Sequence, residues 1–358
     1  MTHFLNTMSP VARSVLFGAL GLIVGNLLCH WVVWLTEPMR PPDSLPVLPR
    51  NRRPSNWTHR IPLVGSLLAG GNGCDRGQPI ERWWLWCELG TAVLFAAFTA
   101  AYFDFHCQQT PEVRPEERWR IARCFYQLVL ISLLVAATAT DLRDYTISDW
   151  ITLPGLLIGI LGAAASGDLQ MVHVWVDWND PLVELNGPYL PDWMKEHQHW
   201  HGLAWSVCGL AAGAGITSVV WALSRLILGR EAMGFGDVTL MAMIGSFVGW
   251  QPVVFIFLLA PLCGLAISVP LRLMTGKTFL PYGPYLSAAA LVVLFAWRWI
   301  WMLELKISAD RTFSIRRLMG DWQTLLLLAA ISTVALAGLL LLVRLYRLVP
   351  VPLRRDPP

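Results

Sequence analysis

The sequence predicts an all-α fold: a polytopic helical membrane protein with about nine transmembrane helices. Of its 358 residues, 55% are hydrophobic and only 14% are charged, and the mean hydropathy is +0.50. These values are far from those of a soluble globular chain. Several apolar runs also reach the ~20 residues that a helix needs to cross a bilayer. Because lipid offers no partner for exposed backbone groups, each crossing is expected to be helical.

The expected crossings follow the apolar runs in chain order. The fourth and sixth are short, so their ends are poorly marked. The crossings are Val11–Leu35, Trp83–Phe103, Ile121–Thr140, Ile151–Ser166, Leu203–Leu228, Val238–Trp250, Pro252–Leu273, Tyr285–Leu303 and Gln323–Val343.

Basic residues give the orientation, because short loops rich in arginine stay on the cytoplasmic side. The segment between the first two crossings holds several arginines, from Arg40 to Arg82, and is therefore placed in the cytoplasm. The acidic segment 167–202 then lies outside. Arg311, Arg316 and Arg317, between the last two crossings, run against this pattern.

Cysteine and histidine give little sign of a metal site. The seven cysteines include no C-x-x-C pair, so neither a zinc nor a redox motif is indicated. Three histidines alternate in the outside segment: His197, His199 and His201. They could bind one metal ion only if this segment had an extended backbone. Four tryptophans favour instead a polar loop anchored at the headgroup level. They are Trp175, Trp178, Trp193 and Trp200.

Two acidic residues stand at the cytoplasmic ends of predicted helices. Asp141 ends the third apolar run and Asp237 opens the sixth, so both lie on one face. Ionisable groups at membrane depth are costly, which makes a functional role the default hypothesis. Two carboxyls close together in a low dielectric do not both ionise easily, so one pKa is raised and the pair holds one proton. In peptide hydrolysis, one carboxylate would take a proton from water while the other, protonated, polarises the scissile carbonyl.

Ordinary structural roles fit the same two acids. Asp237 could be the N-cap of the helix that it begins, and on spacing alone capping and catalysis are about equally favoured. Asp141 could be a helix C-terminal residue paired with Arg143. Gly234 and Gly236, beside Asp237, would let a substrate backbone lie close to the acid.

Three blocks together resemble the signature motifs of the type IV prepilin peptidases, which are bacterial inner-membrane aspartyl proteases of the G-x-G-D class. The blocks are TDLRDYTISDWITLPG, GFGDVTL and LPYGPYLSAAAL, which begin at Thr140, Gly234 and Leu280. The likeness extends from about Gly21 to Leu291. It is specific as a set, whereas any single block is a weak signal.

The resemblance implies removal of the short basic leader from type IV pilin-like or pseudopilin precursors. It assigns Asp141 and Asp237 as the catalytic aspartates. It implies substrate-binding or site-shaping roles for Gly234, Gly236, Asp149, Glu88, Pro281, Gly283 and Pro284. The last three would form a rigid turn that closes one wall of the site. Asp149 also fits a helix cap, and Glu88 a partner of Arg82.

Three departures from the family pattern limit this inference. The first cytoplasmic loop keeps only Cys74 of the paired cysteines that many members have, so no metal is expected. Many members also methylate the new N-terminus with S-adenosylmethionine, but no glycine-rich nucleotide fingerprint is visible, so methylation is left open and proteolysis needs no cofactor. Thr239 stands where the family usually has Lys, which removes a cation that could steady the ionised acids.

The leading hypothesis is an aspartic endopeptidase in the bacterial inner membrane, with its active site facing the cytoplasm. Its partners would be prepilin-like precursors and the bilayer; the net charge of +3 follows from membrane orientation and needs no nucleic acid. The chain divides into a first helix (1–36), a cytoplasmic loop without an intact zinc motif (37–82), a catalytic core (83–303) with an extracytoplasmic insert (167–202), and an extra helix with a basic tail (304–358). An ion-coupled transporter and a non-catalytic scaffold are the alternatives.

Overall fold

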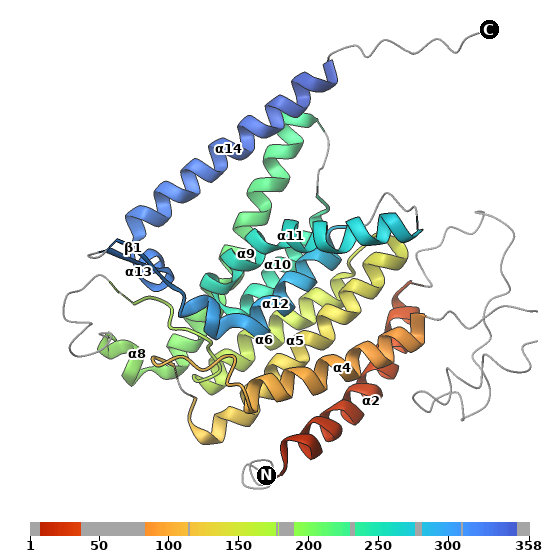
Figure 1. The fold of residues 1–358 in the computed structure, drawn as a ribbon, viewed down its shortest axis with the longest axis vertical. Coiled ribbons are helices and arrows are strands. Elements are labelled where there is room, and N and C mark those ends of the chain that lie inside the picture. Colours follow the sequence, from red (N-terminus) through yellow and green to blue (C-terminus); the bar gives the residue numbers. More distant parts are fainter. Residues whose placement is uncertain are drawn as a thin grey trace, which may run out of the picture.

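Long apolar helices make up most of the computed structural model (Figure 1). It describes residues 8–36, 83–113, 115–176, 178, 190–229, 233–275, 281–308 and 311–348. Within these residues, eight helices are long and apolar enough to cross a membrane. The predicted polytopic helical membrane protein is thereby confirmed. The whole loop 37–82, with Cys74 and Arg82, lies outside the described residues.

The helices follow one another as the apolar runs predict. The eight long helices are α2 (Pro10–Thr36), α4 (Trp83–Phe103), α5 (Glu117–Asp144), α6 (Asp149–Ser166), α9 (Gln198–Leu228), α11 (Trp250–Thr275), α12 (Gly283–Trp301) and α14 (Trp322–Leu348). The shorter elements are α8 (Asp192–Glu196), α10 (Phe235–Val248), α13 (Ile315–Gly320) and the antiparallel strands β1 (Glu304–Ser308) and β2 (Arg311–Ser314).

The sixth predicted crossing, Val238–Trp250, is the short helix α10. Its 14 residues extend about 21 Å, which is less than the ~30 Å of a hydrocarbon core. Gly249 ends the helix with a φ of 84°, and a side chain at this position would overlap the Trp205 indole. The sixth expected crossing, already short in the sequence, is thus a helix too short to count among the candidate spans, because the apolar run continues through a helix break that hydropathy does not reveal.

Neighbouring helices surround α10 on almost every side. It packs against α5, α6, α9, α11 and α12. Gly209 of α9 lies so close to the Gly245 backbone oxygen that any side chain would overlap it, and Gly213 lies equally close to the Met241 oxygen. Small residues permit such close approach of helix backbones in membranes. The middle of α10 is thereby held tightly against α9 inside the helix bundle.

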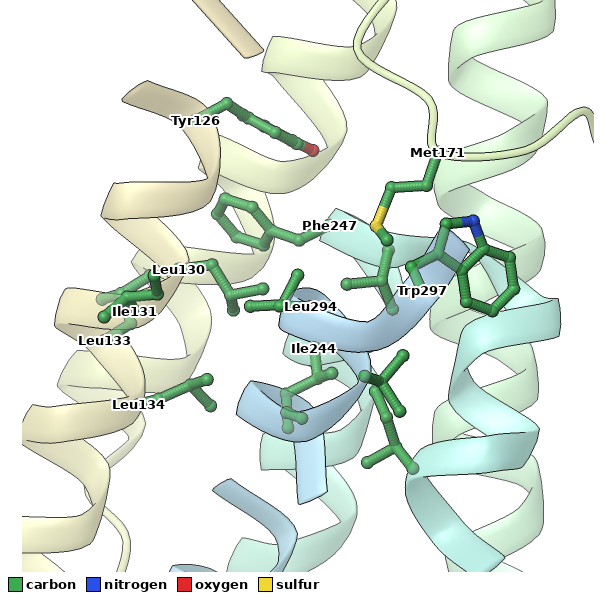
Figure 2. Packing of buried hydrophobic residues seen from close by; sticks show 14 of the residues in the cluster. Tyr126, Leu130, Ile131, Leu133, Leu134, Met171, Ile244, Phe247, Leu294 and Trp297 are labelled. Carbon is green, nitrogen blue, oxygen red and sulfur yellow. The ribbon is translucent and has the colours of Figure 1, made fainter. Parts of the chain in front are cut away.

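The hydrophobic core lies where α5, α10 and α12 meet (Figure 2). Leu130 of α5, Ile244 and Phe247 of α10 and Leu294 of α12 belong to this cluster, and all four side chains are fully buried. The Phe247 ring also lies 4.5 Å from the Tyr126 ring, centroid to centroid. Because protein interiors pack densely, this cluster fixes the relative positions of three helices whose ends carry the candidate site.

A β-hairpin and α13 lie together at one end of the bundle (Figure 1), and the all-α prediction did not include the hairpin. Arg316 of α13 donates a hydrogen bond of 2.9 Å to Glu112 and also pairs with Glu304. Its guanidinium lies 5.3 Å from the centroid of the Trp178 ring. These contacts give Arg316 a local role on the predicted outer face. They also place Trp178 in a buried contact, so the prediction that it is an interfacial anchor is wrong.

Loss of the Arg316 charge should destabilise the fold. Glu112 is only 5% exposed, so Arg316→Met would leave its carboxylate buried without a cation. We expect the free energy of unfolding to fall by roughly 2 kcal/mol, measured by thermal unfolding in detergent. Arg118→Met is the matched control, because the Arg118–Glu116 pair is 69% and 55% exposed and should contribute less than about 0.5 kcal/mol. Equal losses in the two variants would contradict this account.

Candidate active site

Asp237 lies at the third position of α10 and is nearly fully buried. Gly234 is the N-cap, so the expectation that Asp237 itself occupies the cap position is wrong. Its carboxylate instead reaches back, and Oδ2 accepts a hydrogen bond of 3.2 Å from the Gly234 N–H. A carboxylate at this position satisfies one of the free amides of a helix start and interacts favourably with the helix dipole. A capping role and a place in a buried site therefore coexist in one side chain.

Asp141 lies in the last turn of α5 and is also nearly fully buried. Its Oδ2 accepts a hydrogen bond of 3.1 Å from the N–H of Gly283, the first residue of α12. The predicted partner, Arg143, has its guanidinium 5.5 Å from the centroid of the Trp83 ring. The Asp141 carboxylate is thus bound by the start of another helix, as the Asp237 carboxylate is bound by the start of its own.

The two acids come together because three chain segments meet at one place: the α5–α6 loop, the start of α10 and the start of α12. The helices α5, α10 and α12 pack against one another in pairs. Asp237 lies within electrostatic range of Asp141. Ile147 of the α5–α6 loop lies beside both Gly236 and Gly283. The two buried carboxyls therefore belong to one poorly hydrated site, close enough for their charges to interact.

The three predicted glycines have different amounts of space. A Cβ at Gly283 would overlap the Asp141 carboxylate, and one at Gly236 would lie 3.1 Å from the Cβ of Ile147. A Cβ at Gly234 would meet only ordinary contacts, the nearest being 3.8 Å to Asp237 Oδ2. Close approach therefore explains Gly283 and Gly236, whereas nothing in the packing explains Gly234.

The segment Pro281–Pro284 forms the start of α12. Pro281 is buried, Tyr282 is the N-cap, and Pro284 lies in the first turn, where its missing N–H costs nothing. Burial raises the pKa of the Tyr282 phenol to about 12, and the charge of Asp237 contributes to this shift. Tyr282 therefore stays un-ionised as a hydrogen-bond donor near the acids.

Two further predicted residues lie apart from this meeting point. Asp149 is exposed in the first turn of α6, and the N-cap there is Ser148, whose side chain accepts a hydrogen bond from the Trp150 N–H. The expectation that Asp149 is the cap is wrong. Glu88 is fully buried between α4 and α2, where its carboxylate accepts a hydrogen bond of 2.7 Å from Asn26.

Ile147 and Tyr282 belong to the site, yet the sequence reasoning did not select them. Ile147 lies between the two blocks that carry the acids, and its apolar side chain carries no chemical signal of its own. Tyr282 lies between Pro281 and Gly283, which were selected. A polar aromatic residue inside that turn is the one signal that could have identified it.

The remaining polar residues show no sign of a metal centre. The Thr239 hydroxyl donates back to the Gly236 carbonyl at 3.0 Å, so it is directed to the backbone. The histidine segment is not extended, because α9 begins at Gln198; His201 is buried and His199 contacts the Ala164 carbonyl. In the part of the chain that the structure describes, no three His, Cys, Asp or Glu residues gather into a possible metal site.

Comparisons with known proteins point in one direction. A family model described as the type IV leader peptidase family matches residues 193–269. The prepilin leader peptidase/N-methyltransferase of Klebsiella pneumoniae is 30% identical over 204 residues, which cover 57% of this chain and 68% of that protein. The protein of the same name from Aeromonas hydrophila is 28% identical over 267 residues, or 71% and 73% of the two chains. No solved structure matches the chain.

Proposed function

Because the chain belongs to the type IV leader peptidase family, we propose that it removes the short basic leader of type IV prepilin or pseudopilin precursors, with Asp141 and Asp237 as its catalytic acids. The observation that carries this proposal is the meeting of two buried carboxyls from α5 and α10 at the start of α12. An aspartic endopeptidase needs two buried acids held in place, and here backbone N–H groups hold both carboxylates by hydrogen bonds.

The reaction is hydrolysis by a water molecule held between the acids. One carboxylate takes a proton from the water, whose oxygen attacks the scissile carbonyl carbon, while the other, protonated carboxyl donates a hydrogen bond to the carbonyl oxygen. Collapse of the tetrahedral intermediate breaks the C–N bond. The leaving amine takes the proton that the first carboxyl gained, and the pair ends with one shared proton.

Backbone anchoring of the two Oδ2 atoms supports these roles. The Gly283 N–H donates a hydrogen bond to Asp141 Oδ2, and the Gly234 N–H donates one to Asp237 Oδ2. We assign the other oxygen, Oδ1, of each acid to the exchange of protons with water and substrate. Anchors that are already in place limit the reorganisation needed during the reaction. The neutral Tyr282 phenol adds a donor beside Asp237.

The other predicted residues have three different roles. Gly236, Pro281, Gly283 and Pro284 shape the helix starts that hold the acids. Asp149 is exposed at the start of α6 and can meet the basic leader of a precursor. Glu88 is enclosed between α2 and α4, so we assign it to helix packing through Asn26 and not to leader binding.

Two contacts support a cytoplasmic active site in a bacterial inner membrane. Arg143, two residues after Asp141, lies over the ring of Trp83, the first residue of α4, so the site lies at the same end of the bundle as the start of α4. At the other end, Arg316 joins the segment after α12 to Glu112, between α4 and α5. Because the arginine-rich part of the sequence, 40–82, leads directly into α4, the positive-inside rule favours a cytoplasmic location for this end and both acids.

The names of the relatives also include N-methyltransferase, which would use S-adenosylmethionine as the methyl donor. The Gly234 amide of the glycine-rich turn at α10 is already bonded to Asp237, so it is not free to bind the carboxylate of this cofactor. We therefore assign this turn to proteolysis alone.

Co-expression with a tagged prepilin-like precursor from the same genome tests the function. We expect a gel shift and an intact mass that show loss of the leader; an added 14 Da on the new N-terminus would report methylation. Failure to cut any such precursor would contradict the peptidase. Flux through reconstituted vesicles that requires Asp237, without cleavage, would instead support an ion-coupled carrier.

A further inference from the structure

The side chain of Ile147 lies between the two turns that hold the acids. We infer that Ile147 is a positioning residue: its side chain is a spacer that fixes the separation of the Asp141 and Asp237 carboxyls. This inference rests on the proposed function, since it concerns the same two acids. Ile147 takes no part in proton transfer. It acts on the two acids only through the backbone at Gly236 and Gly283, which its side chain contacts.

Two different atoms of Ile147 make the two contacts. Its Cβ, together with its backbone N and O, lies against Gly236, where an added Cβ would be 3.1 Å from the Ile147 Cβ. Its Cδ1 lies against Gly283, where an added Cβ would be 3.0 Å away. One face of the side chain therefore supports the turn that precedes Asp237. The far end supports the residue whose N–H binds Asp141.

The backbone on both sides of Ile147 is held in place. Tyr145 ends α5 in the left-handed region, with φ 55°, and its N–H donates to the Asp141 carbonyl at 3.0 Å. Ser148 caps α6 directly after Ile147. A tyrosine with positive φ is unfavourable, so it persists only where the surroundings determine the backbone path. The loop is thus short and fixed at both ends, as a spacer requires.

Shortening the side chain should relax the contact with Gly283 in two steps, while the Cβ contact with Gly236 is kept. Ile147→Val removes Cδ1 and with it the support of Gly283, but keeps the Cβ against Gly236. Ile147→Ala also removes both Cγ atoms, so a wider gap opens beside Gly283, while the Cβ still lies against Gly236. Because a misplacement of about 1 Å can cost about 10²-fold in rate, we expect kcat for precursor cleavage to fall roughly 5-fold in Ile147→Val and roughly 10²-fold in Ile147→Ala. KM should stay within about twofold, since the substrate-binding surface is unchanged.

Ile131→Val is the matched control. Ile131 is fully buried in α5, ten residues before Asp141 and about 15 Å along the helix. The same methylene is removed, so stability should fall by about 1 kcal/mol, while kcat should be unchanged. A kcat for Ile147→Ala within threefold of wild type would overturn the inference. A loss that falls on KM alone would also overturn it, because Ile147 would then contact the substrate.

A second readout does not depend on proteolysis. With the native cysteines replaced, the double variant Asp141→Cys/Asp237→Cys can be bridged by bifunctional thiol reagents of increasing span. With Ile147 present, one narrow range of spans should dominate; with Ile147→Ala added, the range should broaden. If the range of reagent spans does not change, Ile147 is not a spacer, even if Ile147→Ala cleaves slowly. If wild type cuts no precursor but the range still broadens, the spacer holds and the peptidase proposal fails.

Discussion

Asp141→Asn and Asp237→Asn should each reduce cleavage of a prepilin-like precursor by on the order of 10⁴-fold. An amide is neither a base for the attacking water nor an acid for the scissile carbonyl, so one substitution removes half of the proton exchange. Asn can still accept the hydrogen bonds from Gly283 and Gly234, so both variants should insert and fold. The initial rate of leader release from a purified precursor measures the effect.

Asp192→Asn is the matched control for these variants. Asp192 is exposed in α8, in the segment 167–202 that the sequence predicts to lie on the opposite face of the membrane. The same chemical change there should leave the rate within about twofold of wild type, as expected for an exposed site far from the reaction. Wild-type rates in both the Asp141 and the Asp237 variants would rule out the proposed mechanism.

Gly283→Ala should have the second largest effect on cleavage. The added methyl group would overlap the Asp141 carboxylate and lie 3.0 Å from the Ile147 Cδ1. Either Asp141 or the start of α12 must then move by about 1 Å, which is enough to lower kcat by roughly 10²-fold. The measurement is kcat from a full titration with precursor, so that a change in KM is separated from a change in rate.

Gly215→Ala distinguishes this steric effect from the general effect of replacing a membrane glycine. Gly215 lies in α9, and a Cβ there would meet no atom within 4 Å. Alanine should be neutral or slightly stabilising at this position. If Gly283→Ala cleaves as fast as Gly215→Ala, the contact between Gly283 and Asp141 does not position the acid.

Much of the fold could be predicted from hydropathy alone. Eight of the nine expected crossings exist as long helices, because a bilayer leaves a long apolar segment few alternatives. The length of α10 could not be predicted, because the apolar run continues past Gly249, whose positive φ and close approach to Trp205 appear only in the folded chain. The β-hairpin could not be predicted either, since its strands are four and five residues long.

The candidate site was predictable to the extent that chemistry is visible in residue types. Two acids at helix ends, with glycines beside one of them, predicted that Asp141 and Asp237 lie on the same face of the membrane. The role of Gly283 as a backbone donor depends on a contact between residues 142 positions apart, which no local pattern contains. The burial of Glu88 against Asn26 likewise arises only when α2 and α4 pack.

The most direct test of the account is the mass of the products when the purified chain is incubated with a purified prepilin-like precursor. Wild type should release one leader peptide and one mature chain whose masses add up to the precursor plus one water molecule. The double variant Asp141→Asn/Asp237→Asn should leave the precursor intact. Release of the same leader by the double variant would contradict the assignment of the two acids, and an intact precursor with wild type would contradict the peptidase itself.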